Sequence, residues 1–188
     1  VGIANVNVNV CDLNQNWLNG VSTDNNGYYT LYGAPAGTYK VQFYAQHLGN
    51  YANEWWNNQR RFETADEVVV TTGTTTANID AQLEIKGSIS GTVSDATSSN
   101  PIENVHVYVY DLAQNEMGNC YSDANGHYTL NNLDPANYKV YINTIEIPIY
   151  IEEWYNDKNS FDNADEVTVN ENATTTVDVG LAALPDDA

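Results

Sequence analysis

Apolar and polar residues alternate with a period of two along most of the chain, a pattern typical of β-strands with one buried face. The alternation predicts strands at 6–10, 29–31, 39–43, 68–70, 79–83, 105–109 and 177–181. The best helical candidates are single turns in the loops 53–65 and 152–164. Asn26-Gly27 and Asn125-Gly126 stand between strands and predict tight hairpins with positive φ at both residues. The fold class expected is all-β, built from antiparallel sheets with one wet side.

The pattern occurs twice, at an offset of 99 residues. TDNNGYYTL (23–31) matches SDANGHYTL (122–130), and FETADEVVV (62–70) matches FDNADEVTV (161–169). Beyond these strings the register slips by one, so that Ile79 corresponds to Val177. We therefore expect two tandem β-sandwich repeats, residues 1–84 and 85–188, with a short join that fixes their angle.

The strings GTVSD, NPIENVHVYVYD, SDANGHYTLNNL, NYKVYI and ADEVTV, in this order, resemble the carboxypeptidase regulatory-like domain. The resemblance implies a transthyretin-like, Cna-B-like or Ig-like antiparallel sandwich of about seven strands. It covers nearly all of both copies and implies accessory roles such as stalks, linkers and binding modules, because fold does not fix function. This chain departs from the family in a long insert at 46–64 and 145–163, rich in Trp, Asn and acids.

The first copy lacks the strand that opens the second. Residues 87–95, GSISGTVSD, read as the first strand of copy 2, whereas Val1 already corresponds to Asn100. Either the start of copy 1 is truncated, or the strand comes from another chain and completes an open edge. The donor would be the tail 182–188 or residues before Val1. The start at Val1 without Met indicates a mature product or a fragment.

The charge limits the partners. Six Lys and Arg against 25 Asp and Glu give a net charge of −19, which repels nucleic acid and anionic membranes. No apolar run is long enough to span a membrane. The composition, rich in Asn, Thr and Tyr, is typical of secreted and surface β proteins. His47, His106 and His127 do not recur at matching positions and no catalytic motif occurs, so we expect no enzyme.

The insert is the best candidate for a metal site, because carboxylates and amides are the hard oxygen ligands that calcium prefers. Asp66 and Asp165 are the strongest candidates, and the alternative is a loop whose polar groups bond its own backbone. The full candidate set is Asp66, Glu54, Asn57, Asn58 and Glu63 in copy 1, and Asp165, Glu153, Asn156, Asp157 and Asp162 in copy 2.

Two thiols and one tryptophan are candidates for contacts between chains. Cys11 has the outward phase of its strand, and Cys120 lies on a similar hairpin of the other copy. Because one chain cannot bring them together easily, we expect either a bridge between neighbouring subunits or two free thiols. Trp17, at a hairpin tip, is expected to be exposed and to stack on sugar or on a neighbour. Trp55 and Trp154 are expected to be buried anchors of the insert, with a ligand platform as the alternative.

These observations predict a structural subunit of an extracellular or cell-surface filament. Copies would join head to tail, with Val6, Val8 and Val10 forming the apolar surface that receives the missing strand. The alternative is a carbohydrate-binding or adhesive module of a larger secreted protein. No cofactor other than calcium is expected.

Overall fold

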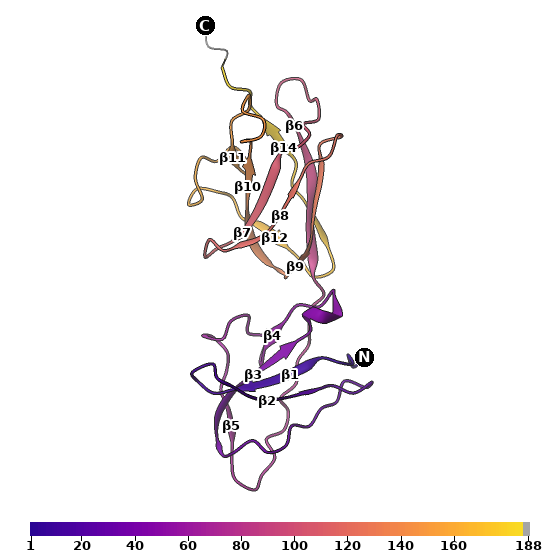
Figure 1. The fold of residues 1–188 in the computed structure, drawn as a ribbon, viewed down its shortest axis with the longest axis vertical. Coiled ribbons are helices and arrows are strands. Elements are labelled where there is room, and N and C mark those ends of the chain that lie inside the picture. Colours follow the sequence, from indigo (N-terminus) through magenta and orange to yellow (C-terminus); the bar gives the residue numbers. More distant parts are fainter. Residues whose placement is uncertain (186–188) are drawn as a thin grey trace. The chain divides into compact units, whose positions relative to one another are not determined.

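Residues 1–185 are described by the structure, a computed structural model, and they form two units that divide between Glu84 and Ile85. Unit 1 is residues 1–84, and unit 2 is the chain from residue 85 onward. Both are built from β-strands (Figure 1). No helix among the described residues is long and apolar enough to cross a membrane. The expected all-β fold is confirmed.

Unit 1 has one sheet. Its strands are β1 (Asn7–Cys11), β2 (Trp17–Ser22), β3 (Gly37–Tyr44), β4 (Glu54–Trp55) and β5 (Val68–Val70). Their order is β2-β1-β3-β4, and β5 pairs with one end of β3. A single 3-10 turn, η1 (Gln46–Leu48), begins the insert. Val8 and Phe43 pair across β1 and β3 and lie in the core with the other apolar residues of these strands.

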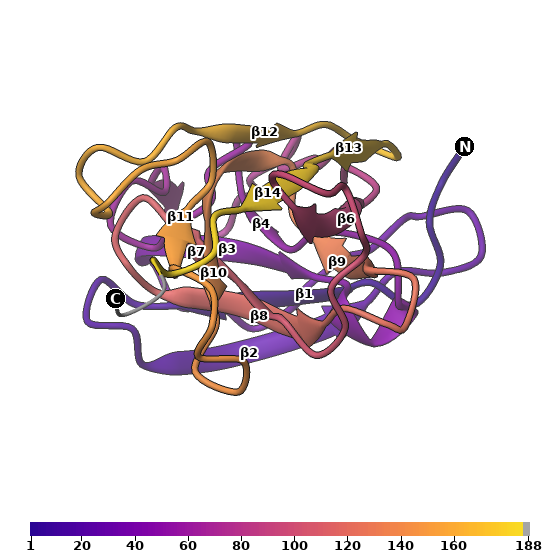
Figure 2. The same ribbon diagram turned by 90° about the horizontal axis from the view of Figure 1, so that it is seen from above.

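Unit 2 repeats this sheet and adds a second one. The first sheet has β7 (His106–Asp111), β8 (Glu116–Tyr121), β10 (Ala136–Asn143), β11 (Glu153–Trp154) and β12 (Val167–Val169), in the order β8-β7-β10-β11 with β12 on β10. The second has β6 (Gly87–Asp95), β9 (His127–Leu133), β13 (Thr174–Thr176) and β14 (Val179–Leu181). β6 lies at its centre, antiparallel to β9 and parallel to β13 and β14. In the view of Figure 2, β6 and β9 of the second sheet lie to the right of β7 and β10 of the first.

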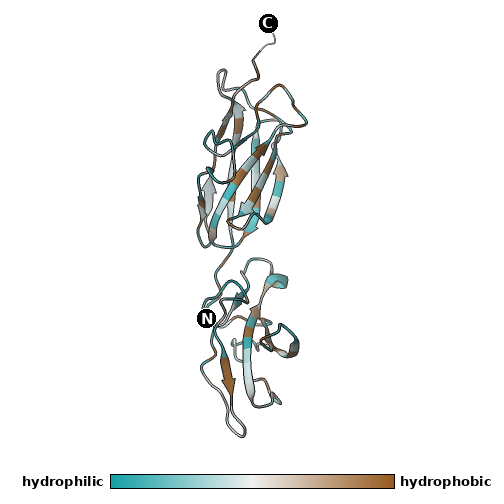
Figure 3. Cartoon of the chain, turned by 90° about the vertical axis from the view of Figure 1, so that its left-hand side faces the viewer, coloured by the Kyte–Doolittle hydropathy of each residue, from teal (hydrophilic) through white to brown (hydrophobic). Residues whose placement is uncertain are grey.

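The core of unit 2 lies between these layers. Its apolar residues alternate with polar ones along the strands, as the colours of Figure 3 show. Ile89, Val107 and Ile142 are fully buried in this cluster. The period-two pattern of copy 2 therefore forms a two-layered sandwich.

Unit 1 does not form the second sheet, and here two of the expected strands are wrong. Residues 28–36 and 72–83 correspond to β9 and to β13 with β14, but they have no strand structure. In unit 2 these segments pair with β6, and the described part of unit 1 has no such strand. Without a central partner their backbone groups have no ladder to join, although the apolar alternation is present.

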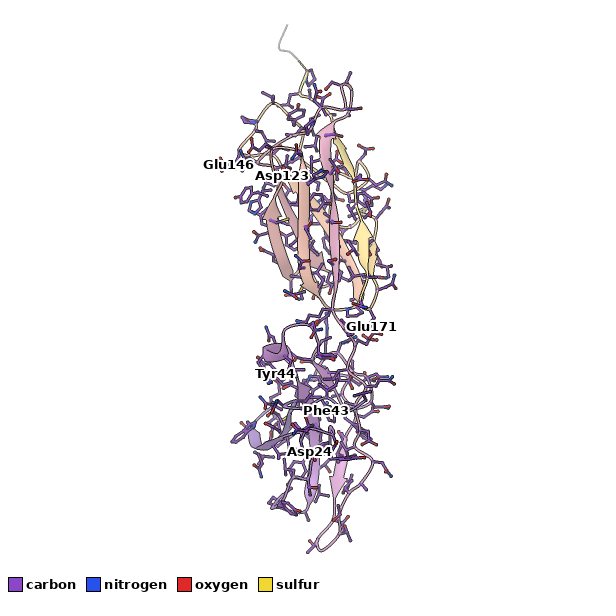
Figure 4. The ribbon with its side chains drawn as sticks, turned by 90° about the vertical axis from the view of Figure 1, so that its right-hand side faces the viewer. Asp24, Phe43, Tyr44, Asp123, Glu146 and Glu171 are labelled. Carbon is purple, nitrogen blue, oxygen red and sulfur yellow. The ribbon has the colours of Figure 1, made fainter. Side chains whose placement is uncertain are left out.

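The hairpin turns also differ from expectation. Gly27 and Gly126 take positive φ, of 80° and 74°, but neither Asn26 nor Asn125 does. Asp24 and Asp123, both labelled in Figure 4, fix these turns: each side chain accepts backbone N–H groups two and four residues ahead. The aspartate at the turn start therefore selects a turn in which glycine alone is left-handed.

The tail after β14 is bound rather than free, up to the end of the described residues. Ile151 donates its N–H to Ala182, and Leu184 donates to Ile149, so residues 182–184 run beside 149–151 of the same unit. The insert of unit 2 thus already pairs with residues 182–184 of the tail that was expected as a possible strand donor. Residues 186–188 lie outside the described part. The loops 53–65 and 152–164 contain the short strands β4 and β11 followed by turns, and no helix.

Candidate functional site: an open groove in unit 1

A long groove lies in unit 1 where unit 2 has its second sheet. Its floor is the core face of β1 and β3, including Val6, Val8, Val10, Val41 and Phe43. Its walls are the two strandless segments, 28–34 and 74–83. The volume is about 1330 Å³, which exceeds the roughly 300–1,000 Å³ of ordinary small-molecule pockets. The three valines predicted for an interface thus form the floor of the groove.

Unit 2 shows what fills the equivalent space. There β6 lies between the two walls, and its Ile89 and Val93 are completely buried on the shared core. Its backbone is bonded on both sides: β9 pairs with it on one side, and on the other Ser90 accepts from Val177 and Thr92 donates to the side chain of Asp178. The corresponding acceptor in unit 1, Asp80, is exposed and lines the groove.

One hydrogen bond joins the two walls in both units. Tyr128 Oη donates to the carbonyl of Val177 at 2.6 Å, and Tyr29 Oη donates to the carbonyl of Ile79 at 2.5 Å. Burial, together with the nearby charge of Asp80, raises the pKa of Tyr29 to about 12, so the phenol keeps its proton at neutral pH. The ring also packs edge-on against Phe43, with centroids 6.0 Å apart. Sequence reasoning missed this bond, although Tyr29 and Tyr128 occur at matching positions.

The strand that passes this bond in unit 2 has no room for side chains at two points. A Cβ on Gly91 would lie 1.8 Å from the carbonyl oxygen of Val177. A Cβ on Gly87 would lie 2.5 Å from the carbonyl oxygen of Asn170. Both obstacles are backbone atoms that cannot rotate away, so glycine is required at both positions.

The insert is anchored in the same way in both units. Lys40 Nζ donates to the carbonyl of Phe62 at 2.6 Å and lies 4.4 Å from the centre of its ring. Trp55 packs edge-on against that ring. Lys139, Phe161 and Trp154 repeat these contacts at the same distances. The two tryptophans therefore hold the insert on the outer face of the sheet, as predicted.

The calcium candidates are only partly brought together. Asp66 accepts the side-chain amide of Asn57, and Asp165 accepts that of Asn156. Asn57, Asn58, Asn156 and Asp157 have left-handed backbone, a conformation that Asn and Asp tolerate best among non-glycine residues, which explains their presence in these turns.

Glu54 and Glu153 lie on the short strands β4 and β11 rather than in the turns. Glu54 is only 3% exposed, and burial raises its pKa. Burial and the neighbouring charge of Asp157 raise the pKa of Glu153 to about 7. Among residues 1–185 no three His, Cys, Asp or Glu side chains are close enough together to hold a metal ion. The calcium sites remain predictions.

The two cysteines are less accessible than an intersubunit bridge requires. Cys11 pairs with Lys40 on the face opposite the core, but it is only 8% exposed there. Cys120 instead packs against the core of unit 2. Burial raises the pKa of both thiols, so both stay protonated. Cys11 thus faces away from the core, as predicted, but it is covered there, which favours the free-thiol alternative. Trp17 is 67% exposed, as predicted.

A row of aromatic rings covers the outer face of the first sheet of unit 2, and sequence reasoning missed it. Tyr121, His106 and Tyr108 follow one another at centroid distances of 4.0 Å. From Tyr108 the row continues through Tyr110 and Tyr141 to Trp154, at 4.9 to 6.2 Å. The corresponding residues of unit 1 are Ser22, Asn7, Asn9, Cys11, Gln42 and Trp55. The sequence signal for this row is that Tyr108 and Tyr110 alternate with buried valines, at positions where copy 1 has Asn9 and Cys11.

A protein-family model matches the second half of the sequence. The carboxypeptidase regulatory-like domain matches residues 88–182, which is just over half of the chain. The chain belongs to the carboxypeptidase regulatory-like domain family. The match begins within β6 and ends just after β14, so it covers the complete two-layered sandwich and confirms the expected domain type. No curated protein matches the sequence.

Solved structures similar to this chain show the same fold at low identity. The minor pilin GBS52 of Streptococcus agalactiae has a TM-score of 0.51 and 13% identity, with 100% of this chain and 86% of that one covered. A streptococcal ancillary pilin has a TM-score of 0.57 and 13% identity, with coverage of 97% and 58%. The Bacillus anthracis TIE protein, at a TM-score of 0.45 and 20% identity, matches 97% of this chain but only 31% of its own. This chain therefore spans only part of two of these three proteins.

Proposed function

We propose that this chain is a structural subunit of an extracellular filament or surface fibre, joined head to tail to copies of itself, and that it has no catalytic role. The observation that carries the proposal is the open groove of unit 1. A large groove over an apolar sheet face, between two walls that have no strand pairing, is a template for strand addition. Strand addition through one groove per chain repeats without closing on itself, unless the rotation between subunits happens to close a ring.

Two further features support this role. The net charge of −19 keeps individual subunits soluble and apart until a specific contact forms. The fold, shared with two streptococcal proteins described as pilins, is one that surface fibres use.

Electron microscopy of the native material tests the proposal. Protein isolated from the surface or medium of its source cells is expected to appear as regular filaments that contain this chain. A reconstruction should show the groove of unit 1 filled by an extra strand. If the native protein is recovered only as monomers at high concentration, the filament proposal is wrong.

The aromatic row of unit 2 favours a second candidate function, a carbohydrate-binding or adhesive module. Flat rings that line one sheet face offer stacking surfaces for sugars, and Glu116 and Glu152 beside the tyrosines offer polar contacts at the edge. Tyr121 is 52% exposed, so the row is open to solvent at one end.

Calorimetry with cellohexaose and chitohexaose tests this alternative. The double variant Tyr108→Asn, Tyr141→Gln gives unit 2 the residues that unit 1 has at these positions, so it serves as a matched control. If the unmodified protein binds a saccharide and the double variant does not, the result would support the carbohydrate-binding function. Equal heats for both proteins, or no binding by either, would exclude this row as a binding site for these saccharides.

A further inference from the structure

In unit 2 the space equivalent to the groove of unit 1 is occupied by β6. The sequence of β6 therefore indicates which kind of strand the groove of unit 1 can accept. We propose that the groove binds an extended strand from a neighbouring chain with the pattern Gly-x-aliphatic-x-Gly-x-aliphatic. This inference deepens the proposed function, because it names the chemistry of the strand that would join two subunits.

The two aliphatic positions follow from the floor. In unit 2 the strand turns Ile89 and Val93 onto the core, and both are fully buried. The floor of unit 1 has the same valines at Val6, Val8 and Val10 as unit 2 has at 105, 107 and 109. Tyr29, Leu31 and Ile79 of the walls already pack on this cluster, so an incoming strand with aliphatic residues four apart would join an apolar core of the same composition.

The two glycine positions follow from the walls. Gly91 passes beside the carbonyl of Val177 and the ring of Tyr128, the two partners of the hydrogen bond across the walls. Unit 1 keeps this bond between Tyr29 and Ile79 although no strand lies beside it. A strand that enters must therefore present its bare backbone to the carbonyl of Ile79. Gly87 serves the same purpose beside Asn170, which corresponds to Thr71 in unit 1.

The direction of the strand is also fixed. β6 runs antiparallel to the wall that contains Tyr128 and parallel to the wall that contains Val177. Asp178 accepts the N–H of Thr92, one residue after the second glycine. Asp80 offers the same carboxylate in unit 1, so the residue after the second glycine should not be proline.

Within the described chain, neither the segment that has this pattern nor the C-terminal tail is free to act as a donor. The pattern with Ile, Leu or Val at both aliphatic positions occurs once in the sequence, at Gly87–Val93, and this segment is already paired as β6. The tail is bonded to residues 149–151 as far as Leu184, and the Pro-Asp-Asp-Ala that follows in the sequence has neither glycine nor an aliphatic pair. A strand of the stated chemistry from a neighbouring chain is therefore the occupant we propose.

A synthetic peptide of residues 85–95, IKGSISGTVSD, tests the proposal on the purified chain. Binding is followed by fluorescence anisotropy of the labelled peptide and by hydrogen exchange. The peptide should bind and should slow the exchange of amides in residues 28–32 and 75–82. A peptide with Gly91→Val should bind at least tenfold more weakly, since its Cβ would overlap a backbone carbonyl. The variant Asp80→Ala should weaken binding by about threefold to tenfold through loss of one acceptor.

Three outcomes would overturn the proposal. The first is no binding of the parent peptide at millimolar concentration, and the second is equal binding of the Gly91→Val peptide. The third is full exchange protection of residues 75–82 without any peptide, which would show that the groove is already closed. The test is independent of fibre formation. Peptide binding without native filaments would refute only the fibre, and native filaments without peptide binding would refute only the strand pattern.

Discussion

Tyr29 donates its phenolic proton to the carbonyl oxygen of Ile79 at 2.5 Å, across a groove through which no strand passes. The same bond in unit 2, from Tyr128 to Val177, closes over β6. The walls of unit 1 are thus already connected before any strand arrives. Preorganisation of this kind lowers the ordering cost of binding.

Removal of the Tyr29 hydroxyl should loosen the walls of the groove. We expect Tyr29→Phe to destabilise unit 1 by about 0.5–1.5 kcal/mol, the net value of one hydrogen bond, and to speed amide exchange in residues 77–80. Tyr128→Phe is the matched variant and should cost about 1–3 kcal/mol, because it leaves a buried carbonyl without its partner. Denaturant unfolding with exchange measurements checks both. If Tyr29→Phe lowered the free energy of unfolding more than Tyr128→Phe does, the weaker contribution assigned to the bond in unit 1 would be wrong.

The stability of unit 2 should fall as the pH rises from about 4.5 to 7. Burial raises the pKa of Glu153 to about 7, so between these values the folded state holds a proton that the unfolded state has released. Folding is therefore favoured at the acid end of this window. Glu153→Gln should remove most of this slope and leave the stability near pH 4 almost unchanged. Thermal melts from pH 4 to 8 measure it, and an unchanged slope in the variant would refute the assignment.

The lysine anchors should stabilise the two inserts equally. Lys40→Met and Lys139→Met each remove a charged hydrogen bond to a phenylalanine carbonyl and a cation–π contact. We expect each to cost about 1.5–3 kcal/mol, measured by denaturant unfolding of the single variants. Lys86→Met, which removes a lysine paired with Asp134 outside the insert, is the control and should cost less. If both anchor variants match the control, the inserts are held by other contacts.

Cys11 and Cys120 should behave as free, unreactive thiols in the folded chain. Both are protonated at neutral pH because burial raises the pKa of each, and Cys11 has little exposed surface. A thiol reagent should therefore modify them only after unfolding, and non-reducing electrophoresis should give a single band at the mass of one chain. A ladder of disulfide-linked bands from freshly folded protein would revive the bridge between subunits.

The predicted calcium sites are tested by melting. If Asp66 and Asp165 bind calcium in the native state, millimolar calcium should raise the melting temperature, and a chelator should reverse the effect. Asp66→Asn and Asp165→Asn should each weaken the response by half if the two sites are alike. A melting temperature that ignores both calcium and chelator would show that these carboxylates only hold the turns through Asn57 and Asn156.

The sequence was sufficient for the strands whose partners lie in the same copy. Val6, Val8 and Val10 face the core as their period predicts, because β2 and β3 supply their neighbours from the same unit. It failed at Tyr29–Leu31 and Ile79–Leu83, which have the same period but no strand between them. Strand formation depends on a partner as much as on side-chain pattern, and the pattern of one segment contains no information on its partner.

The groove itself could be inferred from the sequence, but its detail could not. Comparison of the two copies shows that copy 1 lacks a counterpart of residues 87–95. That the missing strand must have glycines follows only from distances, such as the 1.8 Å between a Cβ on Gly91 and the carbonyl of Val177. The bonding of residues 182–184 was equally hidden, since it depends on the path of a long insert that no periodic pattern describes.

The pairing of β6 has a mechanical consequence. This strand is bonded along both edges, antiparallel to β9 on one side and parallel to β13 and β14 on the other. A strand seated in this way and pulled along its own axis must break its hydrogen bonds together, in shear, rather than one after another as in a zipper. If a neighbour's strand occupies the groove of unit 1 in the same manner, tension along a fibre would load the joints between chains in this same shear geometry.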